Sequence, residues 1–296
     1  MINGTEQRER CNQVLPLGAG RVLGFAEYGT LRGDAIFYFH GWPGSRLEAQ
    51  LLEDAALELG ARIIAIDRPG YGLSTFVRGR RLVNWPRDVH LLANALKIDR
   101  FSVIGVSGGG PYALACAAHL PKRVNRAAIV CGVGPLMDSA SAEGMQRARQ
   151  FACAILRQSP AMSRPLSYAV LRGLRSKPGP LIETMAHFLP DSDKAVLLTQ
   201  DIRDTLVDSF TEALIQGVQG PAQDLRIYFA PWGFDVRSVE VEVGFWHGEQ
   251  DVVIPSHMSR RLAEIVPGCQ TTFFEAEGHY SLPITRRREI VQSVFG

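Results

Sequence analysis

The feature that most constrains the fold is an alternation of short apolar segments with helical patterns in both outer parts of the chain. Six segments of strand length are rich in Ile, Val and Phe and show little polar alternation, as strands buried on both faces do. They are residues 35–40, 62–67, 101–106, 126–131, 241–247 and 270–274. Helical patterns lie between most of them. Strands that alternate with helices predict an α/β fold with a mostly parallel central sheet and helices on both faces.

Two stretches depart from this alternation. Residues 14–28 contain a Gly-Ala-Gly interruption, which predicts an antiparallel hairpin at one edge of the sheet. Residues 136–239 contain no strand pattern; they show helical stretches divided by seven prolines. We therefore expect a core of residues 1–135 and 240–296 and a helical cap insertion of residues 136–239. The predicted cap helices lie around 144–158, 167–174, 180–188 and 203–216.

A helix start is predicted at Ser45, with Glu48 three residues later. This spacing is typical of a capping box, in which each side chain accepts a hydrogen bond from an amide of the first turn. Gly60 is placed to end that helix.

Composition excludes several classes of protein. The 296 residues carry 32 basic and 30 acidic side chains, so a net charge of +2 indicates no binding to nucleic acid or to an anionic membrane. No segment has the length and apolarity of a membrane span, and no signal peptide is visible. Five scattered cysteines without a CxxC pair indicate a reducing compartment and no disulfide framework. We expect a cytoplasmic monomer or homodimer that acts on a small molecule and needs no metal and no cofactor.

A candidate nucleophile is Ser107, which lies in a GxSxG sequence between a predicted strand and a predicted helix. This is the context of a nucleophile elbow, a sharp turn that exposes the serine hydroxyl above the sheet. The alternatives are a glycine-rich phosphate loop or an ordinary turn. The absence of a GxGxxG or GxxxxGK[ST] pattern here argues against a nucleotide loop.

A base and an acid follow Ser107 along the chain. Asp251 and His279 each come just after a predicted parallel strand, at the edge of the sheet where open α/β proteins bind ligands. The order Ser, Asp, His is that of an α/β-hydrolase triad and differs from the two familiar serine-protease orders. We predict that Ser107, Asp251 and His279 form a catalytic triad.

Together these motifs resemble the α/β-hydrolase superfamily, in its subgroup of capped serine hydrolases. The likeness rests on His40-Gly41-Trp42-Pro43-Gly44-Ser45, on the Asp67-Arg68-Pro69-Gly70-Tyr71-Gly72 turn, on the elbow and on Glu277-Gly278-His279. It covers roughly residues 20–135 and 240–296. The resemblance implies an oxyanion hole made by the backbone amides of Trp42 and Gly108. We interpret His40 as a residue that braces its loop, with a second base as the alternative, and Asp67 and Arg68 as bracing the tight Gly-Tyr-Gly turn, with a substrate role as the alternative.

The resemblance selects Asp251 as the acid, three residues after a glycine. Glu249 remains an alternative two residues away, and Asp138 is a second, because some relatives carry the acid after the preceding strand.

The expected reaction is the hydrolysis of a small to medium, apolar carboxylic ester through an acyl-enzyme. Haloalkane dehalogenases and epoxide hydrolases of this superfamily have Asp in place of the elbow serine, which argues against those activities. C–C bond hydrolysis, iminopeptidase activity and perhydrolysis stay open, and the alternative of another class is a ligand receptor without turnover. Trp42, Phe188 and Trp232 are candidate substrate contacts, with packing inside the protein as the alternative for each.

Overall fold

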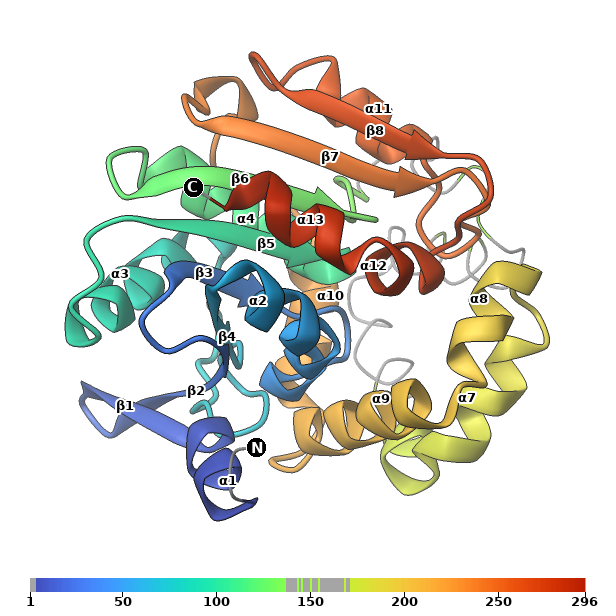
Figure 1. Ribbon diagram of the computed structural model, residues 1–296, viewed down its shortest axis with the longest axis horizontal. Helices are drawn as coiled ribbons and strands as arrows, with labels where there is room; N and C mark the ends of the chain where they lie inside the picture. Colours follow the sequence, from blue (N-terminus) through green and yellow to red (C-terminus); the bar gives the residue numbers. More distant parts are fainter. Residues whose placement is uncertain are drawn as a thin grey trace.

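The central element of the computed structural model is an eight-stranded sheet (Figure 1). The structure describes residues 4–136, 143, 145, 150, 154, 168 and 171–295. The strand order is β1-β2-β4-β3-β5-β6-β7-β8. The strands are β1 Gln13–Gly18, β2 Arg21–Gly29, β3 Asp34–Phe39, β4 Ala61–Ile66, β5 Phe101–Val106, β6 Val124–Val130, β7 Glu242–Gly248 and β8 Gln270–Phe274.

The predicted strands and the edge hairpin are confirmed. β1 and β2 pair antiparallel, β2 pairs antiparallel with β4, and every pairing from β4 through β8 is parallel. The carboxyl ends of the parallel strands therefore meet at one edge of the sheet, which positions the loops after β3, β5, β7 and β8 together.

Helices cover both faces of the sheet because successive side chains of each strand point to opposite sides. Phe37 and Phe39 belong to the apolar core on one face, which also includes residues of α3 Trp85–Ala95, α4 Gly110–His119 and, against β7 and β8, α11 His257–Ala263. Ile36 and Tyr38 belong to the core on the other face, which includes residues of α2 Glu53–Leu59 and α13 Arg287–Val294. In Figure 1, α2 and α13 lie in front of the sheet.

The segment that begins at Ser45 differs from the predicted capping box. It starts as a 3₁₀ helix, η1 Arg46–Leu52, which continues into α2 and ends at Gly60 in the left-handed region. Ser45 accepts from the Leu47 amide as expected, at 3.4 Å. Glu48 does not complete the box, because its carboxylate instead accepts the amide N–H of Gly41 in the preceding loop, at 2.8 Å.

The segment between β6 and β7 contains several helices. They are α7 Pro178–Ala186, α8 Asp191–Leu197, α9 Gln200–Ala213 and α10 Gln219–Tyr228. α7, α8 and α9 share an apolar core of their own, whereas Ile227 and Tyr228 of α10 join the core beside the sheet. α8 and α10 were not predicted. The helix expected around 144–158 lies largely outside the described residues. Of the one expected around 167–174, the described residues 168 and 171–174 are helical.

The remaining short elements connect these layers. They are α1 Gly4–Cys11, η2 Leu82–Asn84, η3 Ser107–Gly109, η5 Val236–Ser238 and α12 Ser281–Thr285. Within the described part of the chain, no helix combines the length and apolarity needed to cross a membrane.

Candidate active site

Ser107 lies at the sharp turn between β5 and α4. Its φ of 53° is in the left-handed region, which a non-glycine residue adopts at a cost. Two flanking glycines allow the turn to be this tight. A Cβ at Gly105 would lie 2.5 Å from the carbonyl oxygen of Gly109, and one at Gly109 would lie 2.0 Å from that of Phe39. The geometry is that of a nucleophile elbow.

Ser107, His279 and Asp251 form one hydrogen-bonded chain. The Ser107 hydroxyl lies 3.0 Å from Nε2 of His279 and donates to it. On the other side of the ring, Nδ1–H donates to Oδ2 of Asp251 at 2.7 Å. The loops after β5, β7 and β8 thus bring together three side chains that are distant in sequence. The arrangement allows His279 to take a proton from Ser107 while Asp251 orients the ring.

The Asp251 carboxylate is buried and held ionised by its surroundings. Oδ1 accepts the amides of Val253 and Ile254, both at 2.8 Å, and His247 lies 3.2 Å from Oδ2. Burial alone would raise the pKa of Asp251, but the nearby charge of His279 and hydrogen bonds from His247 and His279 lower it well below its usual range. An ionised acid beside the ring favours the imidazolium that forms during proton transfer.

The alternative acids do not reach His279 in the described structure. The Glu249 carboxylate accepts from the Ser256 hydroxyl at 2.6 Å and pairs with Arg260 on α11. Asp138 lies outside the described residues.

The amides of Trp42 and Gly108 lie beside Ser107. A Cβ at Gly108 would lie 3.0 Å from the Cβ of Trp42, so the two loops are in contact. No acceptor in the described part of the chain takes the Trp42 amide. Gly108 is in the first turn of a helical segment, where amides have no intrahelical acceptor. Two backbone N–H groups that have no acceptor and lie beside a serine hydroxyl are suited to bind an oxyanion.

Glu48 braces the loop that carries Trp42, a role that sequence analysis missed. Its Oε1 accepts both the Gly41 amide at 2.8 Å and the Tyr38 hydroxyl at 2.6 Å. Burial raises the pKa of Glu48 against the effect of these two hydrogen bonds. The carboxyl also lines the cavity at Ser107, so it is a polar group within reach of a bound molecule.

His40 and Arg68 also hold this loop in place through hydrogen bonds, as expected from the sequence. The His40 ring donates from Nδ1 to the carbonyl of Gly41 at 2.8 Å and accepts the Arg68 amide at Nε2. Burial and the nearby Arg68 charge lower the pKa of His40 well below its usual range, so the ring is neutral. The Arg68 guanidinium donates to the carbonyls of His40 and Gly41. His40 is therefore committed to the loop and does not reach Ser107.

Asp224 of α10 connects this loop to the inserted helices. It is fully buried and accepts from Nε of Arg68 and from the Tyr71 hydroxyl, both at 2.7 Å, and from the Tyr112 hydroxyl at 2.6 Å. Arg80 also forms an ion pair with Asp224. One helical turn further, the Tyr228 hydroxyl donates to the carbonyl of Gly108 at 2.9 Å. α10 thus holds both halves of the candidate oxyanion site.

Asp193 of α8 fixes the loop that carries His279. Its buried carboxylate accepts three consecutive backbone amides, those of His279, Tyr280 and Ser281, at 3.0, 2.9 and 2.9 Å. A Cβ at Gly278 would lie 2.4 Å from this carboxylate, so only glycine leaves room for it. No motif marked Asp193 in the sequence, because its partners lie about 86 residues away.

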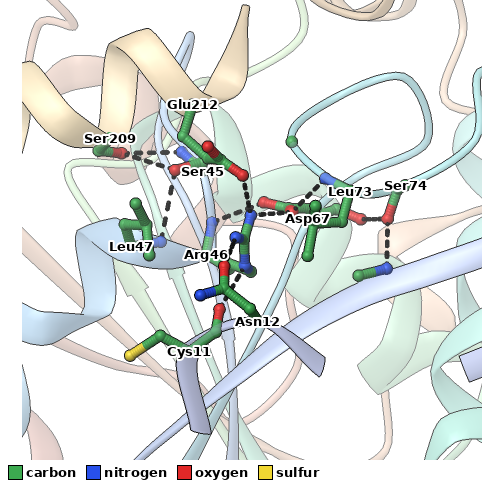
Figure 2. Close-up of polar contacts among 12 residues, drawn as sticks. Cys11, Asn12, Ser45, Arg46, Leu47, Asp67, Leu73, Ser74, Ser209 and Glu212 are labelled. Carbon is green, nitrogen blue, oxygen red and sulfur yellow. Dashed lines mark hydrogen bonds and ion pairs between the residues drawn. The ribbon is translucent and has the colours of Figure 1, made fainter. Parts of the chain in front are cut away.

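Arg46 joins the N-terminal segment, the sheet and the inserted helices (Figure 2). Its Nη1 lies 2.7 Å from Asp67 after β4 and 2.7 Å from Glu212 of α9. Its Nη2 donates to Oδ1 of Asn12 at 2.6 Å. Asp67 also accepts the amides of Arg46 and Leu73, so it braces the Gly-Tyr-Gly turn as the sequence indicated.

A cavity of about 60 Å³ opens beside Ser107 and His279. Trp42 lines it, and its indole N–H donates to the carbonyl of Pro221; its role as a substrate contact stays a prediction. The inserted helices contribute Leu206 and Phe210 of α9.

Phe188 and Trp232, the two other predicted substrate contacts, do not line this cavity as the structure describes it. Phe188 follows α7 at the surface and is 71 % exposed. Trp232 is buried in the core beside the sheet and stacks on Phe234. Both expectations are corrected here: Phe188 is exposed and Trp232 packs in the core, whereas Leu206 and Phe210 of α9 line the cavity at Ser107.

One cluster of metal-ligating residue types occurs in the described part of the chain, formed by Cys131, His247 and Asp251. Its donor atoms already have hydrogen-bond partners. Nδ1 of His247 accepts from the Ser259 hydroxyl and Nε2–H donates to the carbonyl of Ile254, both at 2.7 Å. We therefore interpret Cys131 and His247 as residues that surround and support Asp251, the acid of the candidate triad.

Comparison with known proteins settles the family. A family model described as alpha/beta hydrolase fold matches residues 34–283. The chain belongs to the α/β-hydrolase fold family. The chain is 37% identical over 103 residues to the uncharacterized hydrolase YcgS of Bacillus subtilis, a match that covers 34% of this chain and 36% of YcgS. It is 25% identical over 236 residues to a 2-hydroxy-6-oxo-2,4-heptadienoate hydrolase of Pseudomonas putida, which covers 79% of this chain and 76% of that enzyme.

The fold of this protein also matches that of solved structures. An esterase from Exiguobacterium antarcticum superimposes with a TM-score of 0.68 at 18% identity, over 95% of this chain and 97% of the other. The match to YcgS spans about a third of that relative's length.

Asp224 offers a test of how the protein supports the loop that carries Trp42. Asp224→Ala leaves Arg68 and Arg80 buried without their shared counter-charge, which we expect to cost about 3–5 kcal/mol in the free energy of unfolding. Asp208→Ala, on the exposed side of α9, removes the same side chain and should change it by less than about 0.5 kcal/mol. Urea unfolding at pH 7 measures both. Equal losses in the two variants would contradict this role of Asp224.

The same carboxylate predicts a loss of stability in acid. Burial alone would raise the pKa of Asp224, but Arg80, Arg68 and two tyrosine hydroxyls lower it from 3.8 to about 2. A lowered pKa in the folded state stabilises the protein above about pH 4, and this stabilisation, about 2 kcal/mol, disappears as the pH falls through 2. Unfolding free energies of the wild type measured from pH 5 to pH 2 should fall more steeply than those of Asp224→Asn. If the unfolding free energies of the two proteins fell in parallel with pH, the lowered pKa of Asp224 would be contradicted.

Proposed function

We propose that this protein is a serine hydrolase that cleaves carboxylic esters with a short, apolar acyl group through an acyl-enzyme. The observation that carries the proposal is the continuous hydrogen-bonded chain from Ser107 through His279 to the buried Asp251. The fold family supports it, since many members are hydrolases.

In the proposed reaction His279 takes the hydroxyl proton as Ser107 Oγ attacks the ester carbonyl. The Trp42 and Gly108 amides donate to the resulting oxyanion; one such donor is typically worth about 3–4 kcal/mol. The C–O bond then breaks, and His279 passes its proton to the departing alkoxide. A water molecule repeats the sequence on the acyl-enzyme, which releases the acid and restores Ser107.

The size of the cavity indicates a short acyl group. About 60 Å³ holds only a few water molecules, and Leu206, Phe210, Ile104 and Val130 make most of its wall apolar. A panel of p-nitrophenyl esters tests this directly. We expect acetate and propionate to give the highest kcat/KM and octanoate to fall by about 10-fold or more. Absence of turnover on every ester would overturn the proposal.

Phe210→Ala should enlarge the acyl cavity. Removing its ring from the wall is expected to raise the ratio of kcat/KM for hexanoate over acetate by about 10-fold or more, because each added methylene is worth about 1–3 kcal/mol in a hydrophobic pocket. Phe188→Ala is the matched control: it removes the same ring at an exposed position and should leave the ratio unchanged. If the two variants shift the ratio alike, or if neither shifts it, the proposal that Phe210 of α9 limits the acyl cavity is contradicted.

C–C bond hydrolysis is a second candidate. It is favoured by the similarity to the 2-hydroxy-6-oxo-2,4-heptadienoate hydrolase over 79% of this chain and by the Glu48 carboxyl in the cavity, a polar partner that a simple alkyl ester does not need. A 2-hydroxy-6-oxo-dienoate assayed beside the esters separates the two reactions by their kcat/KM.

A further inference from the structure

A second cavity, of about 290 Å³, has five arginines among its lining residues and shares no residue with the one at Ser107. We name it the arginine cavity. Its lining comprises Arg21, Pro69, Val77, Arg78, Gly79, Arg80, Arg81, Asn84, Trp85, Arg87, Asp88 and Tyr112. Five of these side chains are cationic and one is anionic, a formal excess of four positive charges. The whole chain has a net charge of only +2, so positive charge is concentrated here.

Three of the five arginines are not neutralised by an acid within the described part of the chain. Asp88 is already paired with Arg21, at 2.6 Å. The exposed side chains of Arg78, Arg81 and Arg87 have no ion pair with an acid in the described part of the chain. A concave wall of one sign concentrates the electric field and attracts ions of the other sign.

Arg80 forms a rigid part of the wall. It is 6 % exposed, and its Nη1 donates to the Tyr112 hydroxyl at 2.5 Å while Nη2 pairs with Asp224. Asp224 is shared with Arg68, so one negative charge serves two guanidinium groups. A guanidinium held in place in this way loses little conformational entropy when it binds a ligand.

Acceptors are also scarce around this cavity. Three side-chain nitrogens of its lining residues are buried and have no hydrogen-bond acceptor in the described structure: Nε of Arg21, Nε of Arg80 and Nε1 of Trp85. Charge and hydrogen-bonding groups therefore both favour a ligand that is anionic and rich in oxygen acceptors.

We propose that the arginine cavity binds a multiply charged phosphoryl anion, either a free polyphosphate or the phosphate group of a small organic molecule. Phosphate oxygens match the fork of a guanidinium group, and several arginines can share one such group. The volume approaches the lower end of small-molecule pockets, which suits a compact ligand better than a single chloride ion. This site is separate from the proposed ester chemistry, so its test reads binding and not activity.

The test is isothermal titration calorimetry of the full chain with pyrophosphate and, separately, with glycerol phosphate, at constant ionic strength. We expect saturable binding of at least one of them, with a Kd below about 1 mM. The two ligands distinguish a free polyphosphate from a phosphate monoester. The triple variant Arg78→Ala, Arg81→Ala, Arg87→Ala should weaken binding by at least about 10-fold.

A matched triple variant, Arg32→Ala, Arg172→Ala, Arg175→Ala, removes the same charge from exposed positions outside the cavity and should bind as the wild type does. Thermal unfolding checks that both variants are folded. The proposal is overturned if neither phosphoryl ligand gives saturable binding to the wild type. It is also overturned if the two triple variants lose affinity equally, since that result indicates general attraction to a positively charged protein.

Discussion

Replacing Ser107 with alanine is expected to lower kcat/KM for a short p-nitrophenyl ester by about 10⁴-fold or more. The variant lacks the hydroxyl oxygen that lies 3.0 Å from Nε2 of His279, so no acyl-enzyme can form there. Its fold should persist, because the strained turn has φ near 53° and alanine is no larger than serine. Steady-state kinetics and thermal unfolding of pure protein measure the two effects. Retention of more than about a tenth of the activity would refute the assignment of the nucleophile.

Asp251→Asn is expected to produce the second largest loss, about 10⁴-fold in kcat. The carboxylate accepts Nδ1–H of His279 at 2.7 Å; an amide can present its NH₂ there instead, which favours the wrong tautomer and no longer stabilises imidazolium. The two backbone amides that hold Oδ1 should keep the side chain in place, so the defect is expected in kcat more than in stability.

Glu249→Gln is the matched control for the acid. It makes the same chemical change two residues away, on a carboxylate that bonds Ser256 and Arg260 of α11. We expect its kcat to stay within about threefold of the wild type, since its contacts are exposed and distant from His279. If the Glu249 variant were the inactive one and Asp251→Asn stayed active, the assignment of the acid would be wrong.

The sheet and the loops that carry the site were predictable because each depends on local sequence. Buried parallel strands are runs of Ile, Val and Phe, and the turn at Ser107 requires glycine at positions 105 and 109. Strand order then brings the loops after β5, β7 and β8 to one edge without further information.

The contacts between the inserted helices and the site were not predictable in the same way. Asp193 and Asp224 are buried acids whose partners come from other parts of the chain, and nothing in their neighbouring residues indicates that they will be covered. The helix α10 was missed because Gly220 and Pro221 are poor helix formers, although proline is tolerated in a first turn, where its missing N–H has no partner to lose.

Glu48, Phe188 and Trp232 show how tertiary contacts override a local pattern. The Ser45–Glu48 spacing fits a capping box, but the Gly41 amide and the Tyr38 hydroxyl compete for the Glu48 carboxylate. An apolar aromatic residue in a cap fits a substrate contact and a packed core equally well. Only the docking of α9 decides that Phe210 faces Ser107 while Trp232 is buried elsewhere.

The most direct test of the central claim is intact-protein mass spectrometry after treatment with a fluorophosphonate, followed by peptide mapping. We predict one adduct per chain on the peptide that contains Ser107, loss of ester hydrolysis in proportion to labelling, and no adduct on Ser107→Ala. An adduct on another residue, or full ester hydrolysis by protein that is fully labelled at Ser107, would contradict the proposed mechanism.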